Sequence, residues 1–118
     1  MSCEIRVANR YRKRNDASDM NVKPITVVAQ LHAKPGEEAR VQRELLSLLA
    51  PTHNEPGCLN YDLHRPADTP ALFLFHENWA SKADLDQHLK SPHLQAALAN
   101  VRERLARPPQ ITIWEKVA

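Results

Sequence analysis

Apolar and polar side chains alternate in four separate stretches of the chain, and this is the period of a β-strand. The four stretches are 25–33, 58–65, 71–79 and 110–117. The third stretch is the most apolar, so it is expected at the centre of a sheet. A five-residue link with two prolines joins the second and third stretches, and this length fits a β-hairpin. In the second stretch, Leu59, Tyr61 and Leu63 are predicted to share one face and Asn60 to lie on the other.

Helical periodicity fills the intervals between these strands. A stripe of apolar residues at positions 41, 45, 48 and 49 predicts a helix from Glu37 to about Pro51. Ser81 is predicted to cap a helix that runs to about Lys90, and Ser91 to cap another that ends before two consecutive prolines. The order of elements is therefore β-α-β-β-α(α)-β. This order predicts the ferredoxin-like α+β fold, with a four-stranded antiparallel sheet and helices on one face.

The opposite face of such a sheet has no helix over it, yet it carries apolar as well as polar residues. A large apolar face is rarely left in contact with water. A second copy of the chain, related by a two-fold axis, is the simplest cover. The sequence thus predicts a homodimer in which two sheets lie face to face.

Composition and charge describe an ordinary single domain with a distinct N-terminal segment. The chain has 118 residues, of which 42% are hydrophobic and 25% are charged. Residues 1–23 carry six basic and three acidic groups without a core-forming pattern, which predicts a flexible basic arm before the domain at 24–118. The domain carries ten basic and eleven acidic groups, and this balance argues against nucleic-acid binding.

The sequence also predicts a cytoplasmic protein without a metal or other cofactor. No stretch is apolar and long enough to span a membrane, and no secretory signal is recognised. Cys3 lies in the arm and Cys58 opens a strand, so both are expected to be free thiols. Spacings such as C-x-x-C or H-x-x-x-H are absent, and a proline separates His88 from His93, so no metal site is predicted.

Candidate site residues gather around the end of the third strand. Glu77 and Trp79 are two residues apart, so they point to the same side where the chain turns into a helix. His88 and His93 flank the break between two helices, and histidine exchanges protons near neutral pH. Asn60 offers an amide donor. The expected apolar walls of a pocket are Phe73, Phe75, Leu85 and Leu89.

Four motifs in this region carry a family resemblance. They are Glu55-Pro56-Gly57-Cys58-Leu59-x-Tyr61-x-Leu63-His64-Arg65, Phe75-x-Glu77-x-Trp79, Ala83-x-Leu85-x-x-His88 and Ser91-Pro92-His93. As an ordered set they resemble the antibiotic biosynthesis monooxygenase (ABM) family of dimeric α+β-barrel proteins, from about residue 24 to residue 117. The resemblance implies a dimer of ferredoxin-like subunits, each with a pocket between its sheet and its helices.

The family includes oxygenases that act on aromatic polyketides or quinols without metal or flavin, haem-degrading enzymes, and a group that processes a phosphorylated sugar. Motif alignment places His88 and Leu98 where the haem-degrading branch has Trp and His, which speaks against haem degradation. Polyketide oxygenases have Asn, Trp and Tyr around the substrate. Only Trp79 matches that set, and Phe75 and Leu85 stand at the other two positions.

We therefore predict a cofactor-independent monooxygenase that uses O2 on a small quinol or related aromatic, polyketide-like substrate. Such chemistry needs an electron-rich substrate, a dry pocket, a base and a donor to the developing oxyanion. The predicted roles are pocket walls for Trp79 and Phe75, proton transfer for His88 or His93, and substrate orientation for Glu77 or Asn60.

Two alternatives remain open. One is an isomerase or sugar-phosphate-processing member of the same family, which would need a cation in the pocket such as Lys82 or Arg65. The other is a non-catalytic dimeric protein that binds a ligand or responds to stress.

Overall fold

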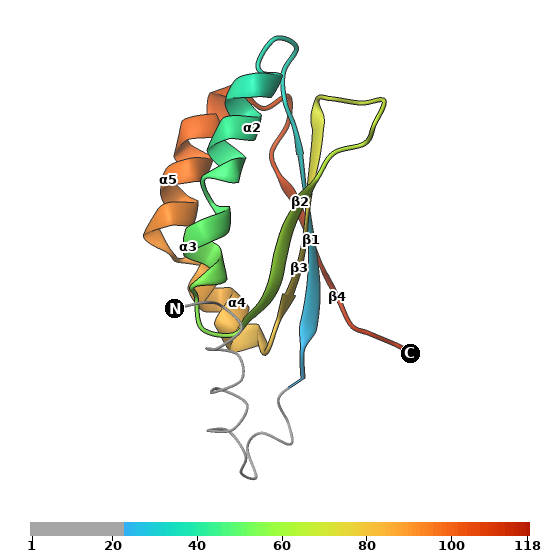
Figure 1. The fold of residues 1–118 in the computed structure, drawn as a ribbon, viewed down its shortest axis with the longest axis vertical. Coiled ribbons are helices and arrows are strands. Elements are labelled where there is room, and N and C mark those ends of the chain that lie inside the picture. Colours follow the sequence, from blue (N-terminus) through green and yellow to red (C-terminus); the bar gives the residue numbers. More distant parts are fainter. Residues whose placement is uncertain (1–22) are drawn as a thin grey trace.

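A four-stranded antiparallel sheet with helices packed on one face forms the protein (Figure 1). The computed structural model describes residues 23–118, so all of the predicted arm except Lys23 lies outside the described residues. The strands are β1 (Ile25–His32), β2 (Cys58–His64), β3 (Leu72–Trp79) and β4 (Gln110–Trp114). Their order across the sheet is β2-β3-β1-β4, which places the most apolar strand in the centre. The predicted ferredoxin-like α+β fold is confirmed.

The helices are α2 (Glu38–Leu46), α3 (Leu49–His53), α4 (Lys82–Leu89) and α5 (Pro92–Val101), and the 3-10 helix η2 (Arg102–Arg104) follows α5. The prediction of one continuous helix from Glu37 to Pro51 was wrong, because the chain breaks the helix at Ser47. The Ser47 hydroxyl donates to the carbonyl of Glu44, and the N–H of Leu48 bonds to the carbonyl of Leu45, one residue closer than in an α-helix.

Serine caps begin the two later helices, as predicted. The Ser81 hydroxyl accepts the N–H of Asp84 at 3.2 Å, and the Ser91 hydroxyl accepts the N–H of Leu94 at 3.4 Å. Each cap satisfies a backbone donor that has no partner inside the helix. The sharp break between α4 and α5 follows from this second cap.

A β-bulge between Cys58 and Asn60 changes the predicted faces of β2. Because the bulge inserts one extra residue, Cys58 and Tyr61 are both buried, whereas Leu59 is only partly buried. The prediction that Leu59 shares the face of Tyr61 was therefore wrong. Cys58 is completely buried. Cys3 lies outside the described residues, so the structure does not test the prediction that Cys3 is a free thiol.

Apolar residues on the inner face of the sheet pack against the helices to form the core. The largest buried members are Trp79, Tyr61, Phe73, Leu45, Leu48 and Leu85. Within residues 23–118, no helix has both the length and the apolar character needed to cross a bilayer.

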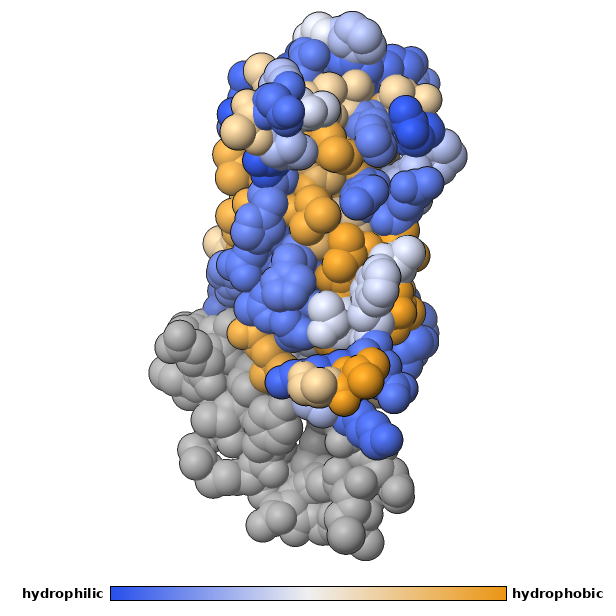
Figure 2. All heavy atoms as spheres, turned by 90° about the vertical axis from the view of Figure 1, so that its right-hand side faces the viewer, coloured by the Kyte–Doolittle hydropathy of each residue, from blue (hydrophilic) through white to orange (hydrophobic). Residues whose placement is uncertain are grey.

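Strand β4 is the exposed edge of the sheet. Ile111 and Ile113 pair with Ala29 and Val27, so they lie on the helix side, yet they are 46% and 52% exposed. Trp114 is 56% exposed. Figure 2 shows a band of apolar side chains on the face of the molecule turned away from the helices. Apolar surface therefore remains uncovered in the single chain.

Candidate functional site

A narrow cavity lies between the sheet and the helices. Its volume is about 40 Å³, and its wall is apolar except for Tyr61, Glu77 and His88. A space of this size holds about one water molecule, whereas an apolar cavity of roughly 150 Å³ has held benzene. Half-exposed Ile111 and partly buried Leu98 are among the residues that line the cavity.

Five of the predicted site residues line this cavity. They are Phe75, Glu77, Leu85, His88 and Leu89. They come from the central strand β3 and from α4, two elements that the chain connects directly through Ala80 and Ser81. The alternation of β3 points Phe75 and Glu77 to the helix side, where α4 covers them.

The other predicted site residues lie elsewhere. Trp79 is fully buried behind Glu77 and His88, and Phe73 is packed in the core without lining the cavity. Asn60 lies on the opposite face of the sheet, where its amide donates to the carboxylate of Asp62 at 2.9 Å. The strand alternation that brings Tyr61 inward turns Asn60 outward. His93 lies outside the cavity, on the solvent side of His88.

Glu77 and Trp79 form a buried polar pair. The indole Nε1 of Trp79 donates to Oε1 of Glu77 at 2.9 Å, and the Glu77 residue is only 4% exposed. Burial raises the pKa of Glu77 above its ordinary value, although the Trp79 hydrogen bond and nearby His88 act in the opposite direction. Burial also raises the pKa of Tyr61, and the neighbouring Glu77 adds to this effect, so the phenol keeps its proton.

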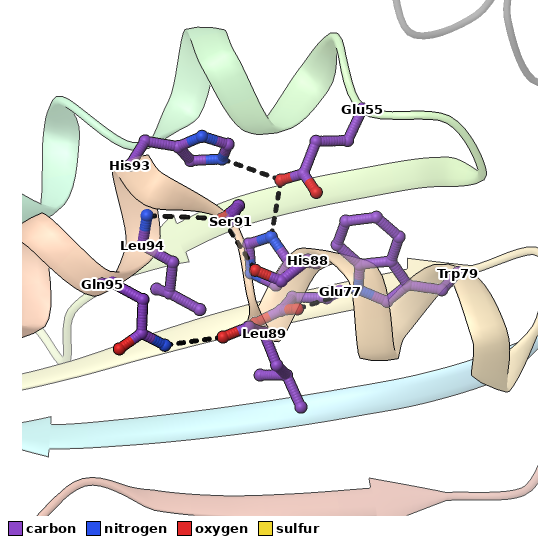
Figure 3. A network of polar contacts seen from close by, with 9 residues as sticks. All are labelled: Glu55, Glu77, Trp79, His88, Leu89, Ser91, His93, Leu94 and Gln95. Carbon is purple, nitrogen blue, oxygen red and sulfur yellow. Dashed lines mark hydrogen bonds and ion pairs between the residues drawn. The ribbon is translucent and has the colours of Figure 1, made fainter.

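A second polar cluster joins the cavity wall to the surface. One oxygen of Glu55, Oε2, lies 2.7 Å from Nδ1 of His88 and 2.8 Å from Nε2 of His93 (Figure 3). An ionised carboxylate can only accept, so both rings donate to it. The His88 side chain is 2% exposed, that of Glu55 13% and that of His93 26%. The cluster thus leads from a buried ring to a solvent-accessible one.

Three local features hold this cluster in place. A turn from Glu55 to Cys58, closed by a backbone hydrogen bond and containing Pro56 and Gly57 with φ of +81°, orients Glu55. His88 lies in the last turn of α4 and packs on Trp79, with ring centroids 4.7 Å apart. His93 is the second residue of α5.

The comparisons with known proteins agree with this architecture. The model of the antibiotic biosynthesis monooxygenase family matches residues 24–100, well over half of the chain. The chain belongs to this family. The ABM fold and the family resemblance predicted from the four motifs are therefore confirmed, and the protein is a member of a monooxygenase-like family.

Two relatives illustrate the likeness. Rv0793 of Mycobacterium tuberculosis, provisionally named a monooxygenase, is 37% identical over 90 residues, which cover 76% of this chain and 88% of the relative. Its solved structure matches with a TM-score of 0.77 at 31% identity, covering 81% of this chain and 97% of that one. PA3566 of Pseudomonas aeruginosa matches with a TM-score of 0.75 at 33% identity, covering 81% and 96%.

Tyr61, in the cavity wall, and Glu55, in the polar cluster, are site residues of this ABM protein that the sequence did not predict. Glu55 is the harder of the two to find. It is the first residue of the motif that begins Glu55-Pro56-Gly57, and it lies 33 positions before His88. The Pro56-Gly57 turn signal before β2 was the available clue, because it fixes the direction of the preceding side chain. The two cations considered for a phosphate ligand do not line the cavity: Lys82 pairs with Asp86, and Arg65 donates to Gln42.

Proposed function

We propose that this protein is a cofactor-independent monooxygenase that oxidises a small quinol or related aromatic with O2. Membership of a monooxygenase-like family supports the reaction class. The main structural support is His88, a histidine in the wall of an apolar cavity whose outer nitrogen is held by Glu55. The other two lines of support come from Glu77 and from the shape of the cavity.

In this proposal His88 is the base. Because Nδ1 carries the proton donated to Glu55, the second nitrogen of a neutral ring, Nε2, has a lone pair. Figure 3 shows Nδ1 of His88 directed toward Glu55, and His88 lines the cavity, so we assign the other nitrogen to the cavity side. Nε2 takes the proton of the substrate hydroxyl, and the electron pair of the O–H bond stays on the substrate oxygen. Glu55 stabilises the imidazolium that forms.

Glu77 supplies the hydrogen bond to the substrate oxygen. Burial favours its neutral acid, which donates a proton in a hydrogen bond as an ionised carboxylate cannot. Trp79 occupies Oε1, which leaves the other carboxyl oxygen for the substrate. Glu77, rather than the distant Asn60, is therefore the residue that we assign to substrate orientation.

The substrate anion then reduces dioxygen itself. One oxygen atom enters the substrate, and the other leaves as water. The substrate gives up four electrons in all, and the two protons of the water also come from it, one of them returned by the His88 imidazolium. The apolar wall around Phe75, Leu85 and Leu89 excludes bulk water from this step. The side chains that line the cavity have to move apart to admit the ring.

Oxygen uptake by the untagged, chelator-treated protein tests the proposal on a panel of hydroquinones and anthrone-like phenols, with autoxidation subtracted. His88→Gln is expected to lower kcat about 10²–10⁴-fold. His64→Gln, at the exposed end of β2, is the matched control and should keep the wild-type rate. A folded His88→Gln protein with the wild-type rate would exclude His88 as the base. No uptake on any substrate would favour the isomerase or the non-catalytic alternative.

We also propose that the working form is a homodimer. Ile111, Ile113 and Trp114 expose apolar surface on both sides of β4, and the sheet face away from the helices carries an apolar band (Figure 2). A second copy would cover this surface and restrict the cavity end beside Ile111. Sedimentation velocity should show a dimer, and Ile113→Lys with Trp114→Lys should shift it to monomer. A wild-type monomer at tens of micromolar would contradict the proposal.

A further inference from the structure

We propose that Glu55, His88 and His93 form a binding site for one divalent transition-metal ion such as Zn²⁺, and that the bound ion inhibits the enzyme. The proposed inhibition depends on the proposed oxygenase function, whereas the proposed metal binding does not. The ion would have no part in the oxygenation itself, so the site is compatible with a cofactor-free reaction.

The donor atoms already converge. One ligand atom from each of the three residues lies within 4.8 Å of the others. Two imidazole nitrogens and one carboxylate oxygen are the ligand set of many Zn²⁺ sites, and three protein ligands leave a fourth position for water. Tetrahedral bonds of about 2.0 Å place ligand atoms ~3.3 Å apart. The two hydrogen bonds, at 2.7 and 2.8 Å, therefore need to lengthen only slightly when an ion replaces their protons.

The surroundings of the cluster favour binding. Trp79 and Tyr61 pack against the His88 ring, with centroids 4.7 and 5.3 Å away, so this ligand loses little freedom when it binds. The N–H of Glu55 donates to the carbonyl of Thr52 at 2.9 Å, which fixes the loop. An open groove of about 490 Å³ borders Glu55 and gives an ion a route from bulk water.

The donor set also selects the class of ion. Imidazole nitrogen suits Zn²⁺, Co²⁺, Ni²⁺ and Cu²⁺, while Mg²⁺ and Ca²⁺ prefer oxygen ligands and more of them. Only one of the three donors is an oxygen. We therefore expect Zn²⁺ and Co²⁺ to bind and millimolar Mg²⁺ not to compete.

Inhibition follows from the two nitrogens of one ring. An ion on Nδ1 of His88 displaces the proton that this nitrogen donates to Glu55. A neutral ring then carries its proton on Nε2, the nitrogen that the proposed function assigns to the cavity side. His88 becomes a donor at the position where the proposed reaction needs an acceptor, and the substrate keeps its proton.

Titration of the untagged, chelator-treated full chain with Zn²⁺ by calorimetry, and with Co²⁺ by visible absorption, tests the site. One ion per chain should bind, with the d–d bands of a four-coordinate site for Co²⁺. Glu55→Gln and His93→Gln should each weaken binding at least tenfold, whereas His64→Gln, an exposed histidine outside the cluster, should bind like wild type. Unchanged affinity in both cluster variants, or no binding at millimolar Zn²⁺, would overturn the site.

Oxygen uptake against Zn²⁺ concentration tests the inhibition. Activity should fall along the calorimetric binding curve and return when the ion is chelated, with millimolar Mg²⁺ as the ionic control. A saturated protein that turns over at the full rate would overturn the inhibition and leave the site standing. A protein with no oxygenase activity at all would overturn the proposed function, and the calorimetric result would still decide the site.

Discussion

Gly57 and Gly36 offer a matched pair for measuring what a crowded turn contributes to this fold. Both have a left-handed backbone, with φ of +81° at Gly57 and +88° at Gly36. A Cβ at Gly36 would meet nothing within 4 Å, whereas a Cβ at Gly57 would overlap the carboxyl group of Asp84. Alanine at Gly36 therefore measures the conformational cost alone, and alanine at Gly57 adds a steric cost.

The magnitudes follow from these two situations. A left-handed conformation costs an L-residue about 1–2 kcal/mol, and this applies to both positions. At Gly57 the neighbour cannot yield easily, because the Ser81 hydroxyl donates to Asp84 at 2.9 Å and caps α4. Overpacking of such a site adds about 1–3 kcal/mol. We expect Gly57→Ala to lower the free energy of unfolding by about 2–5 kcal/mol and Gly36→Ala by about 1–2 kcal/mol.

Urea denaturation followed by tryptophan fluorescence measures both losses, since Trp79 is completely buried in the folded chain. Equal losses for the two variants would refute the steric argument. The turn at Gly57 also orients Glu55, so Gly57→Ala should weaken Zn²⁺ binding and Gly36→Ala should not.

Three further substitutions probe the cavity and the helix cap. Because burial raises the pKa of Glu77, its stabilising contribution is present below its ordinary value of 4.5 and is lost as the pH rises through the folded-state value. Glu77→Gln still accepts the hydrogen bond from Trp79 and cannot ionise, so its stability relative to wild type should rise from pH 4 to pH 7. The rise should be about 1.4 kcal/mol for each unit by which folding raises the pKa of Glu77. A difference in stability that stays constant with pH in urea titrations would contradict this. Ser91→Ala removes the cap on the Leu94 N–H and should cost about 1 kcal/mol in the same assay. Leu85→Ala should cost about 2–5 kcal/mol and, by enlarging the cavity, tighten the binding of bulkier naphthols measured by fluorescence quenching.

Local sequence signals were sufficient to predict most of the fold. Strand alternation predicted that Glu77 and Trp79 share one side of β3, and Ser81 and Ser91 marked the starts of two helices. The signals failed where two local preferences compete. At Ser47 a hydroxyl takes a backbone carbonyl and breaks the helix, and at Leu59 a bulge adds a residue that periodicity does not reveal.

The site was less predictable because its residues meet only through tertiary packing. The residues Phe75, Glu77, Leu85, His88 and Leu89 were predicted from one continuous segment and do line one cavity. Glu55 comes from a distant loop, and no spacing links it to the two histidines.

The arrangement of the cluster makes proton transfer and metal binding mutually exclusive in our two proposals. His88 has Nδ1 toward Glu55, our proposal assigns the other nitrogen to the cavity side, and a neutral ring carries a single proton. When Glu55 holds that proton on Nδ1, the cavity side is a base. When an ion takes Nδ1, the cavity side is a hydrogen-bond donor and no longer a base. Glu55, which lies outside the cavity, therefore determines whether His88 can accept a proton on the cavity side. Replacing Glu55 by Gln should weaken both the basicity of His88 and the binding of the metal ion.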